Sequence, residues 1–214
     1  MPKQSNLKGM AENCQGNDLD AHLNLSLQSP NVAYKHMYED LKIILYPDPR
    51  LGKMSKPVEK FDQNLKDLAA RMFVLMRENR GVGLAAPQVG LNVRMFVMNS
   101  TGKPEDDRVY VNPELTEPLG EEEAEEGCLS LPQINAKILR SLSIQMNARD
   151  LEGNPISQLE SGYIARIWQH EVDHLNGTLL LDRMGPVAKL TNRKIIKELE
   201  QRYKDEQVGE RKTK

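Results

Sequence analysis

The segment QHEVDHLNG at residues 169–177 predicts a helix that carries two histidines on one face. His170 and His174 are four residues apart, which is about 40° around a helix axis, so both imidazoles can reach one metal ion. Glu171 lies beside them and can take a proton from a metal-bound water without being a ligand itself. The motif is therefore typical of metal-dependent hydrolysis, and the alternative is two histidines that match a short pattern by coincidence.

The residues around this motif favour a buried helix. Apolar residues precede it at helical spacing, at Tyr163, Ile164, Ile167 and Trp168. Asn176-Gly177 is a typical helix end, because glycine readily adopts the left-handed conformation that closes a helix.

Two histidines need a third protein ligand, and the residues leave three candidates: a carboxylate downstream, another histidine, or Cys128. Cys128 lies in EGCLSLP, residues 126–132, where Gly127 and Pro132 indicate an irregular segment whose backbone N–H groups can point into a site. A small core cysteine is the alternative. With a cysteine ligand the fourth position would stay open for water, and the thiolate would favour Fe(II), Co(II), Ni(II) or Zn(II) over Mg(II) or Ca(II).

A third motif is the glycine-rich segment GVGLAAPQ at residues 81–88. It lacks the third glycine of a dinucleotide fingerprint and the Lys-Ser/Thr pair of a P-loop, so we do not interpret it as a phosphate-binding loop. Its small residues allow a ligand to approach the backbone, and Gln88 supplies an amide donor. A tightly packed core turn is the alternative.

Taken in order, GVGLAAPQ, EGCLSLP and QHEVDH resemble the three signature motifs of the peptide deformylases, and the resemblance runs from about Leu41 to Met184. It implies an α+β fold in which antiparallel β-sheets pack around a central helix with the HExxH motif, followed by a C-terminal helix. It also implies a reaction, the hydrolysis of the N-terminal formyl group from formyl-methionine of nascent polypeptides, which releases formate.

The resemblance assigns a role to each matching residue. The implied metal ligands are Cys128, His170 and His174. The implied catalytic groups are Glu171 as general acid and base, and Gln88 with the backbone N–H of Leu129 as oxyanion donors. The implied substrate contacts are Gly83 beside the peptide, an apolar methionine pocket of Val82, Tyr163 and Ile167, and Arg166 at the pocket rim.

Two further expectations concern the metal and its surroundings. Similar enzymes imply one divalent ion per chain, with Fe(II) expected and Zn(II), Ni(II) or Co(II) as replacements, because a thiolate-ligated ferrous ion oxidises in air. Glu126 and Arg140 either form a buried ion pair that supports the cysteine segment or are both solvated.

Two other classes of protein compete with this interpretation. A zinc endopeptidase uses the same HExxH helix, but its third ligand usually lies downstream, whereas Cys128 lies upstream. A binding module with a structural metal would need neither Glu171 nor Gln88.

The rest of the chain suggests a single folded unit. We expect a mobile extension at residues 1–40, one catalytic metallohydrolase domain at residues 41–205 and a flexible basic tail at residues 206–214. Within the domain, the alternating patterns predict strands at residues 41–46, 93–98, 108–112, 137–150 and 155–160. The helical patterns predict a helix from Asp62 to Asn79 and a last helix at residues 186–205. The acidic run at residues 121–126 predicts a solvated loop.

Composition limits the partners and the compartment. A net charge of -2, a pI near 6.1 and 5% aromatic residues argue against sequence-specific nucleic-acid binding. The chain has no run of eighteen apolar residues, so no membrane span is predicted. Two cysteines exclude a disulfide scaffold, and Cys14 has no assigned role. The first forty residues contain no Arg and several acids, so we expect a cytoplasmic protein rather than an organelle import signal.

The last predicted helix is basic on its outer side. Its cationic residues are Lys189, Arg193, Lys194, Lys197, Arg202 and Lys204. They would suit docking on the ribosome, where formyl-methionyl nascent peptides emerge, and a solvated helix face is the alternative.

Overall fold

The structure is a computed structural model that describes residues 38–212. The expected mobility of residues 1–37 and the thiol of Cys14 lie outside this range. Among the described residues, none of the helices combines the length and apolar character that a membrane crossing requires.

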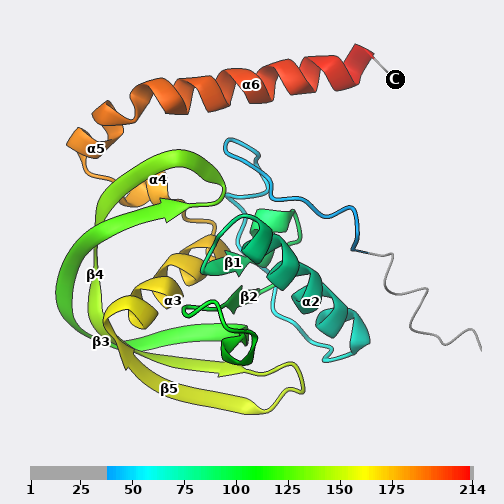
Figure 1. The fold of residues 1–214 in the computed structure, drawn as a ribbon, viewed down its shortest axis with the longest axis vertical. Helices are drawn as coiled ribbons and strands as arrows, with labels where there is room; N and C mark the ends of the chain where they lie inside the picture. The colour runs from blue at the N-terminus through cyan, green and yellow to red at the C-terminus, as the bar shows by residue number, and fades with distance from the viewer. Residues whose placement is uncertain (1–37, 213–214) are drawn as a thin grey trace, which may run out of the picture.

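Five antiparallel strands form one sheet in the order β1–β2–β3–β4–β5, and this confirms the α+β class. The strands are β1 (Gly83–Ala85), β2 (Met95–Met98), β3 (Arg108–Cys128), β4 (Leu131–Arg149) and β5 (Pro155–Ser161). They form a single sheet rather than separate sheets, because β3 and β4 are long enough to curve around the helix beside them (Figure 1).

The acidic stretch at residues 121–126 is part of β3, so the prediction of a loop there is wrong. Glu121 pairs with Ser141 and Glu126 with Ala136 along β4. The alternating pattern of β4 buries Ile138 and exposes its neighbours, and it provides a strand partner over the whole acidic run. The carboxylates before Glu126 remain exposed, whereas Glu126 itself is buried.

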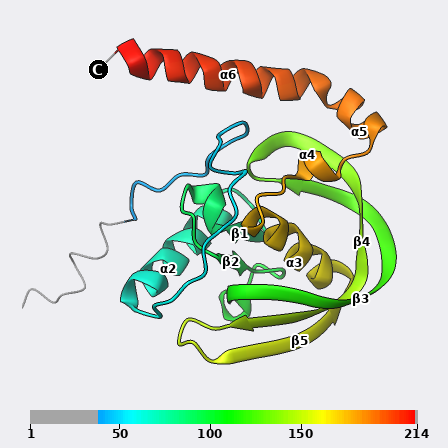
Figure 2. The same ribbon diagram turned by 180° about the vertical axis from the view of Figure 1, so that it is seen from behind.

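Two longer helices pack with the sheet, as the apolar spacing predicts. Helix α2 (Gln63–Glu78) begins where expected, since the Asp62 side chain accepts a hydrogen bond from the backbone N–H of Leu65 at 3.2 Å. Helix α3 (Gly162–Leu175) carries the HExxH motif and contacts all five strands. It lies inside the curve of β3 and β4 (Figure 2), and Trp168 is fully buried there.

The predicted strand at residues 41–46 does not form. The backbone N–H groups of Ile44 and Tyr46 donate to the carbonyls of Gln88 and Ser130, which lie in two different segments, so no ladder is built. This segment instead links the two motifs that contain those residues.

The C-terminal region also differs from the prediction. The remaining helices are η1 (Ala86–Val89), η2 (Pro104–Asp106), α4 (Leu180–Arg183), α5 (Pro186–Thr191) and α6 (Arg193–Lys212). A break at Asn192 divides the expected last helix into α5 and α6. Helix α6 continues to Lys212, so the last helix extends beyond its predicted end at residue 205 into the expected tail. The Arg202–Glu206 pair, spaced i,i+4, supports this extension.

Candidate active site

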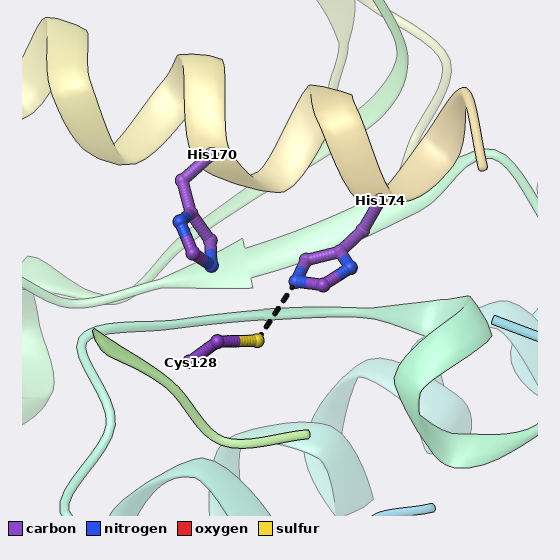
Figure 3. Close-up of side chains that lie close together, drawn as sticks. All are labelled: Cys128, His170 and His174. Carbon is purple, nitrogen blue, oxygen red and sulfur yellow. Dashed lines mark hydrogen bonds between the residues drawn. The ribbon is translucent and has the colours of Figure 1, made fainter. Parts of the chain in front are cut away.

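Helix α3 brings the two predicted histidines together with Cys128. His170 and His174 project from consecutive turns towards the sulfur (Figure 3), and one ligand atom from each of the three residues lies within 4.8 Å of the others. The Sγ atom of Cys128 is 3.2 Å from Nε2 of His174. One sulfur and two imidazole nitrogens at this spacing suit a transition-metal ion such as Fe(II) or Zn(II).

Cys128 stands at the end of β3, where the strand register shifts between Gly127 and Cys128. Burial would raise the pKa of its thiol, but the imidazoles of His174 and His170 outweigh burial and lower the pKa to about 5. Cys128 is therefore a thiolate at neutral pH, the form that binds metals.

Glu126 orients the imidazole of His170 through a hydrogen bond at its Nδ1 atom. Its Oε2 atom lies 3.0 Å from Nδ1 of His170, which leaves Nε2 of this imidazole free to face the sulfur. Arg140 donates to both carboxylate oxygens of Glu126, at 2.9 and 3.0 Å. Of the two alternatives for Glu126 and Arg140, the buried ion pair is therefore the one that forms, and both side chains are nearly inaccessible to solvent.

The charges around Glu126 lower its pKa. Burial alone would raise this pKa, but hydrogen bonds from His170 and Arg140 outweigh burial and hold the value at about 2.

Arg140 also donates a hydrogen bond to Asp173, which in turn accepts one from Arg183 at 2.6 Å. Sequence reasoning missed Asp173, because its partners Arg140 and Arg183 come from other segments of the chain.

Gln88 is held with its amide directed at the cysteine. Its Oε1 atom accepts the backbone N–H of Ala85 at 2.8 Å, so its Nε2 atom is the end that faces Cys128 Sγ at 3.6 Å. The same Nε2 atom lies 3.3 Å from the hydroxyl of Ser130, a buried residue that the motif analysis did not single out. The amide N–H end therefore points towards the sulfur of Cys128.

Glu171 lies on the same helix, buried to 4% exposure, and its Oε2 atom has no hydrogen-bond partner among the described residues. Burial is the main cause that raises its pKa, to about 7. Its carboxylate packs against Gly83 so closely that a Cβ atom at that position would stand 2.2 Å from Oε1. A glycine is thus needed there to make room for Glu171.

The residues predicted to contact substrate line one cavity of about 570 Å³ together with Cys128, His170 and Glu171. Val82 and Tyr163 are exposed at its edge, and Ile167 is buried. Arg166 also lines the cavity, but it is not a free rim residue: it is buried, and its guanidinium donates to Glu126 and to the backbone carbonyl of Ile138.

Comparison with known proteins gives this arrangement a family. The family model of polypeptide deformylases matches residues 40–190. The chain belongs to the polypeptide deformylase family. A peptide deformylase of Thermotoga maritima is 45% identical over 159 residues, covering 74% of this chain and 95% of its own.

Relatives from eukaryotes agree with this result. Peptide deformylase 1B, chloroplastic/mitochondrial, of Arabidopsis thaliana is 42% identical over 168 residues, which cover 77% of this chain and 62% of that protein. A crystal structure of peptide deformylase from Plasmodium falciparum superposes with a TM-score of 0.75 at 40% identity, covering 77% of this chain and 98% of that one.

Peptide deformylases are metal-dependent hydrolases that remove the N-terminal formyl group from nascent peptides, and this chain is such an enzyme. Its substrates are therefore formyl-methionyl peptides. Membership of this family excludes the two alternative functions, a zinc endopeptidase and a binding module with a structural metal.

Proposed function

We propose that deformylation in this chain is carried out by Glu171 and Gln88 beside a metal held by Cys128, His170 and His174. The observation that carries the proposal is the buried, unpartnered Oε2 atom of Glu171 next to three converging ligand atoms. Burying a carboxylate oxygen without a hydrogen-bond partner costs folding free energy. Carboxylates of this kind in cavities cluster at functional sites.

The metal-binding part of the proposal is supported by the sulfur and nitrogen donors and by the lowered pKa of Cys128. One divalent ion per chain, Fe(II) in the cell with Zn(II), Ni(II) or Co(II) as replacements, fits this donor set. When bound, the metal supplies Lewis-acid activation of water and of the formyl carbonyl. Glu126 holds His170 in the orientation that metal binding requires.

The proton-transfer part rests on Glu171. Because its pKa is about 7, its carboxylate accepts a proton near neutral pH and releases it again with little penalty. The proton taken from the attacking water at Oε2 is delivered to the leaving methionine amine. Gly83 keeps the space that this carboxylate occupies.

Gln88 and Leu129 are proposed to stabilise the negative charge that develops on the formyl oxygen during the reaction. The Gln88 amide is fixed at its oxygen end by Ala85, so its N–H group is already oriented before the reaction. A preorganised donor of this kind contributes about 2.7–4 kcal/mol to the transition state. The backbone N–H of Leu129, the next residue after Cys128, is the second proposed donor.

The methionine pocket is proposed from Val82, Tyr163 and Ile167, which give the cavity wall an apolar part. Gly83 would lie beside the formyl group, on a side that has room for hydrogen but not for methyl. Acetyl-methionine peptides should therefore be poor substrates.

The test is formate release from formyl-Met-Ala-Ser and acetyl-Met-Ala-Ser, with protein purified without oxygen and supplied with Fe(II) or Ni(II). Release from the formyl peptide alone, lost in Glu171→Ala, is the expected result. Equal turnover of the acetyl peptide would refute the steric account, and full activity of Glu171→Ala would refute the proposed base.

Ribosome docking is proposed for six cations of α5 and α6, each of which is exposed: Lys189, Arg193, Lys194, Lys197, Arg202 and Lys204. Lys197 and Lys204 form none of the ion pairs recorded among the described residues, so a K197E/K204E variant removes positive charge without breaking a pair. Unchanged, salt-insensitive cosedimentation with ribosomes would refute docking.

Domain limits and compartment also remain proposals. We propose one catalytic domain over residues 41–205, and cytoplasmic localisation from the composition of residues 1–40. One relative is named chloroplastic/mitochondrial, so fractionation of cells that express the full chain is the appropriate check.

A further inference from the structure

Arg80 occupies a backbone position that normally belongs to glycine. It follows the C-cap Asn79 of α2 and has φ 57°, in the left-handed region. The N–H of Arg80 donates to the carbonyl of Arg77, and the N–H of Gly81 donates to that of Met76. These two bonds define a Schellman motif, whose left-handed residue is usually glycine because a side chain there is strained.

Arg80 borders the active-site cavity. Arg80 is exposed and lines the active-site cavity, so it stands at the open side of that cavity. The next residue, Gly81, lies against the cysteine segment, since a Cβ atom at Gly81 would stand 2.7 Å from Cδ1 of Leu129. The end of α2 is therefore part of the wall next to the reaction centre.

Arg80 differs from the other arginine of the cavity lining in forming no ion pair among the described residues. The only other Arg or Lys among the lining residues is Arg166, which is paired with Glu126 and Glu122. No ion pair is recorded for Arg80 within residues 38–212. The exposed acid of the lining, Glu125, faces Lys137 directly across β3 and β4, so its field is partly compensated.

We propose that Arg80 is a specificity-determining residue, which favours formyl-methionyl peptides that carry an acidic side chain at their second or third position. The methionine enters the apolar part of the cavity, and the following residues leave through the open side, past Arg80. The unpaired guanidinium attracts a carboxylate there and repels an ammonium group. The strain of a left-handed arginine is then the cost of a substrate contact.

This inference rests on the proposed site, and its test separates the two. The probes are formyl-Met-Asp-Ser, formyl-Met-Lys-Ser, formyl-Met-Ala-Asp and formyl-Met-Ala-Lys, all with amidated C-termini, assayed with metal-loaded enzyme at low salt. We expect the Asp peptide of at least one pair to be preferred in kcat/KM by about 3- to 10-fold. The preference should shrink in 1 M KCl, where the Debye length is about 3 Å.

Three variants of Arg80 isolate the cause. Arg80→Gly should lose the Asp-over-Lys preference, Arg80→Lys should retain most of it, and Arg80→Glu should invert it. Arg80→Gly should also melt about 2–4 °C higher than the wild type, because the strain is relieved. The peptide preference thus reports the substrate contact of Arg80, and the melting temperature reports the cost of its backbone strain.

Glu117 provides a matched control. It has φ 53°, is exposed, and is absent from the cavity lining. Glu117→Gly relieves the same kind of strain and should leave the peptide preference unchanged.

A wild-type preference below twofold at both positions, or a change below twofold in Arg80→Gly, would overturn the inference while formate release continues. Absence of formate release from every peptide would instead count against the proposed site.

Discussion

Substitution of Gly83 by alanine should abolish most activity while leaving the fold intact. The new methyl carbon would stand 2.2 Å from Oε1 of Glu171 and 2.8 Å from its Cδ. Gly83 pairs with Met98 in the buried part of the sheet, so the backbone has little freedom to retreat. The Glu171 carboxylate is the end of a flexible side chain, and it must move by roughly 1 Å to restore an ordinary contact near 3.4 Å.

A displacement of this size at a catalytic group costs about 100-fold in rate. We therefore expect kcat for formyl-Met-Ala-Ser to fall about 100-fold in Gly83→Ala, with metal content unchanged and a loss of stability below about 2 kcal/mol. The assay is formate release, with metal analysis and urea unfolding of the same preparations.

The control is Gly185→Ala, because a Cβ atom at Gly185 meets nothing within 4 Å. This variant should retain full activity. The effects of Gly83→Ala and Glu171→Ala should also not add in the double variant, since both act on one carboxylate. Retention of more than a third of the activity by Gly83→Ala would refute the reasoning.

Three other variants test separate parts of the account. Gln88→Ala should lower kcat by about 10²–10³-fold with little change in KM, measured by steady-state kinetics, because the donor acts mainly in the transition state; an effect confined to KM would contradict this. Asp62→Ala should lower the unfolding free energy by about 1 kcal/mol in urea titrations and spare activity, since it removes only the α2 cap. Glu126 has a folded pKa of about 2, below its ordinary 4.5, so its stabilisation is complete above pH 4.5 and is lost as pH falls towards 2. The urea midpoint of Glu126→Gln should consequently fall less steeply over this acid range than that of the wild type, and equal slopes would count against the assignment.

The motifs and the periodic helices were predictable from sequence. The spacing of His170 and His174 places both on one helix face, and the Asp62 cap and apolar spacing give α2, because these features depend on local geometry. The hairpin of β4 and β5 was also predictable, since a turn signal separates two alternating segments.

The errors arose where distant residues decide the structure. The acidic run before Glu126 has poor strand propensity, and it is a strand because β4 pairs with it over its full length. The apolar residues near Ile44 have strand propensity, but their backbone partners are two separate segments. The hydrogen bonds of Asp173 and Ser130, and the left-handed conformation of Arg80, likewise follow from tertiary packing rather than from local pattern.

The central claim is that one metal held by Cys128, His170 and His174 works together with Glu171. The most direct measurement is a titration of metal-free protein with Fe(II) without oxygen, with bound metal and formate release recorded for the wild type and Glu171→Ala. The account predicts that both proteins bind one equivalent, that wild-type activity rises linearly to that point, and that Glu171→Ala remains inactive. Activity in the metal-free wild type, or an active metal-loaded Glu171→Ala, would contradict it.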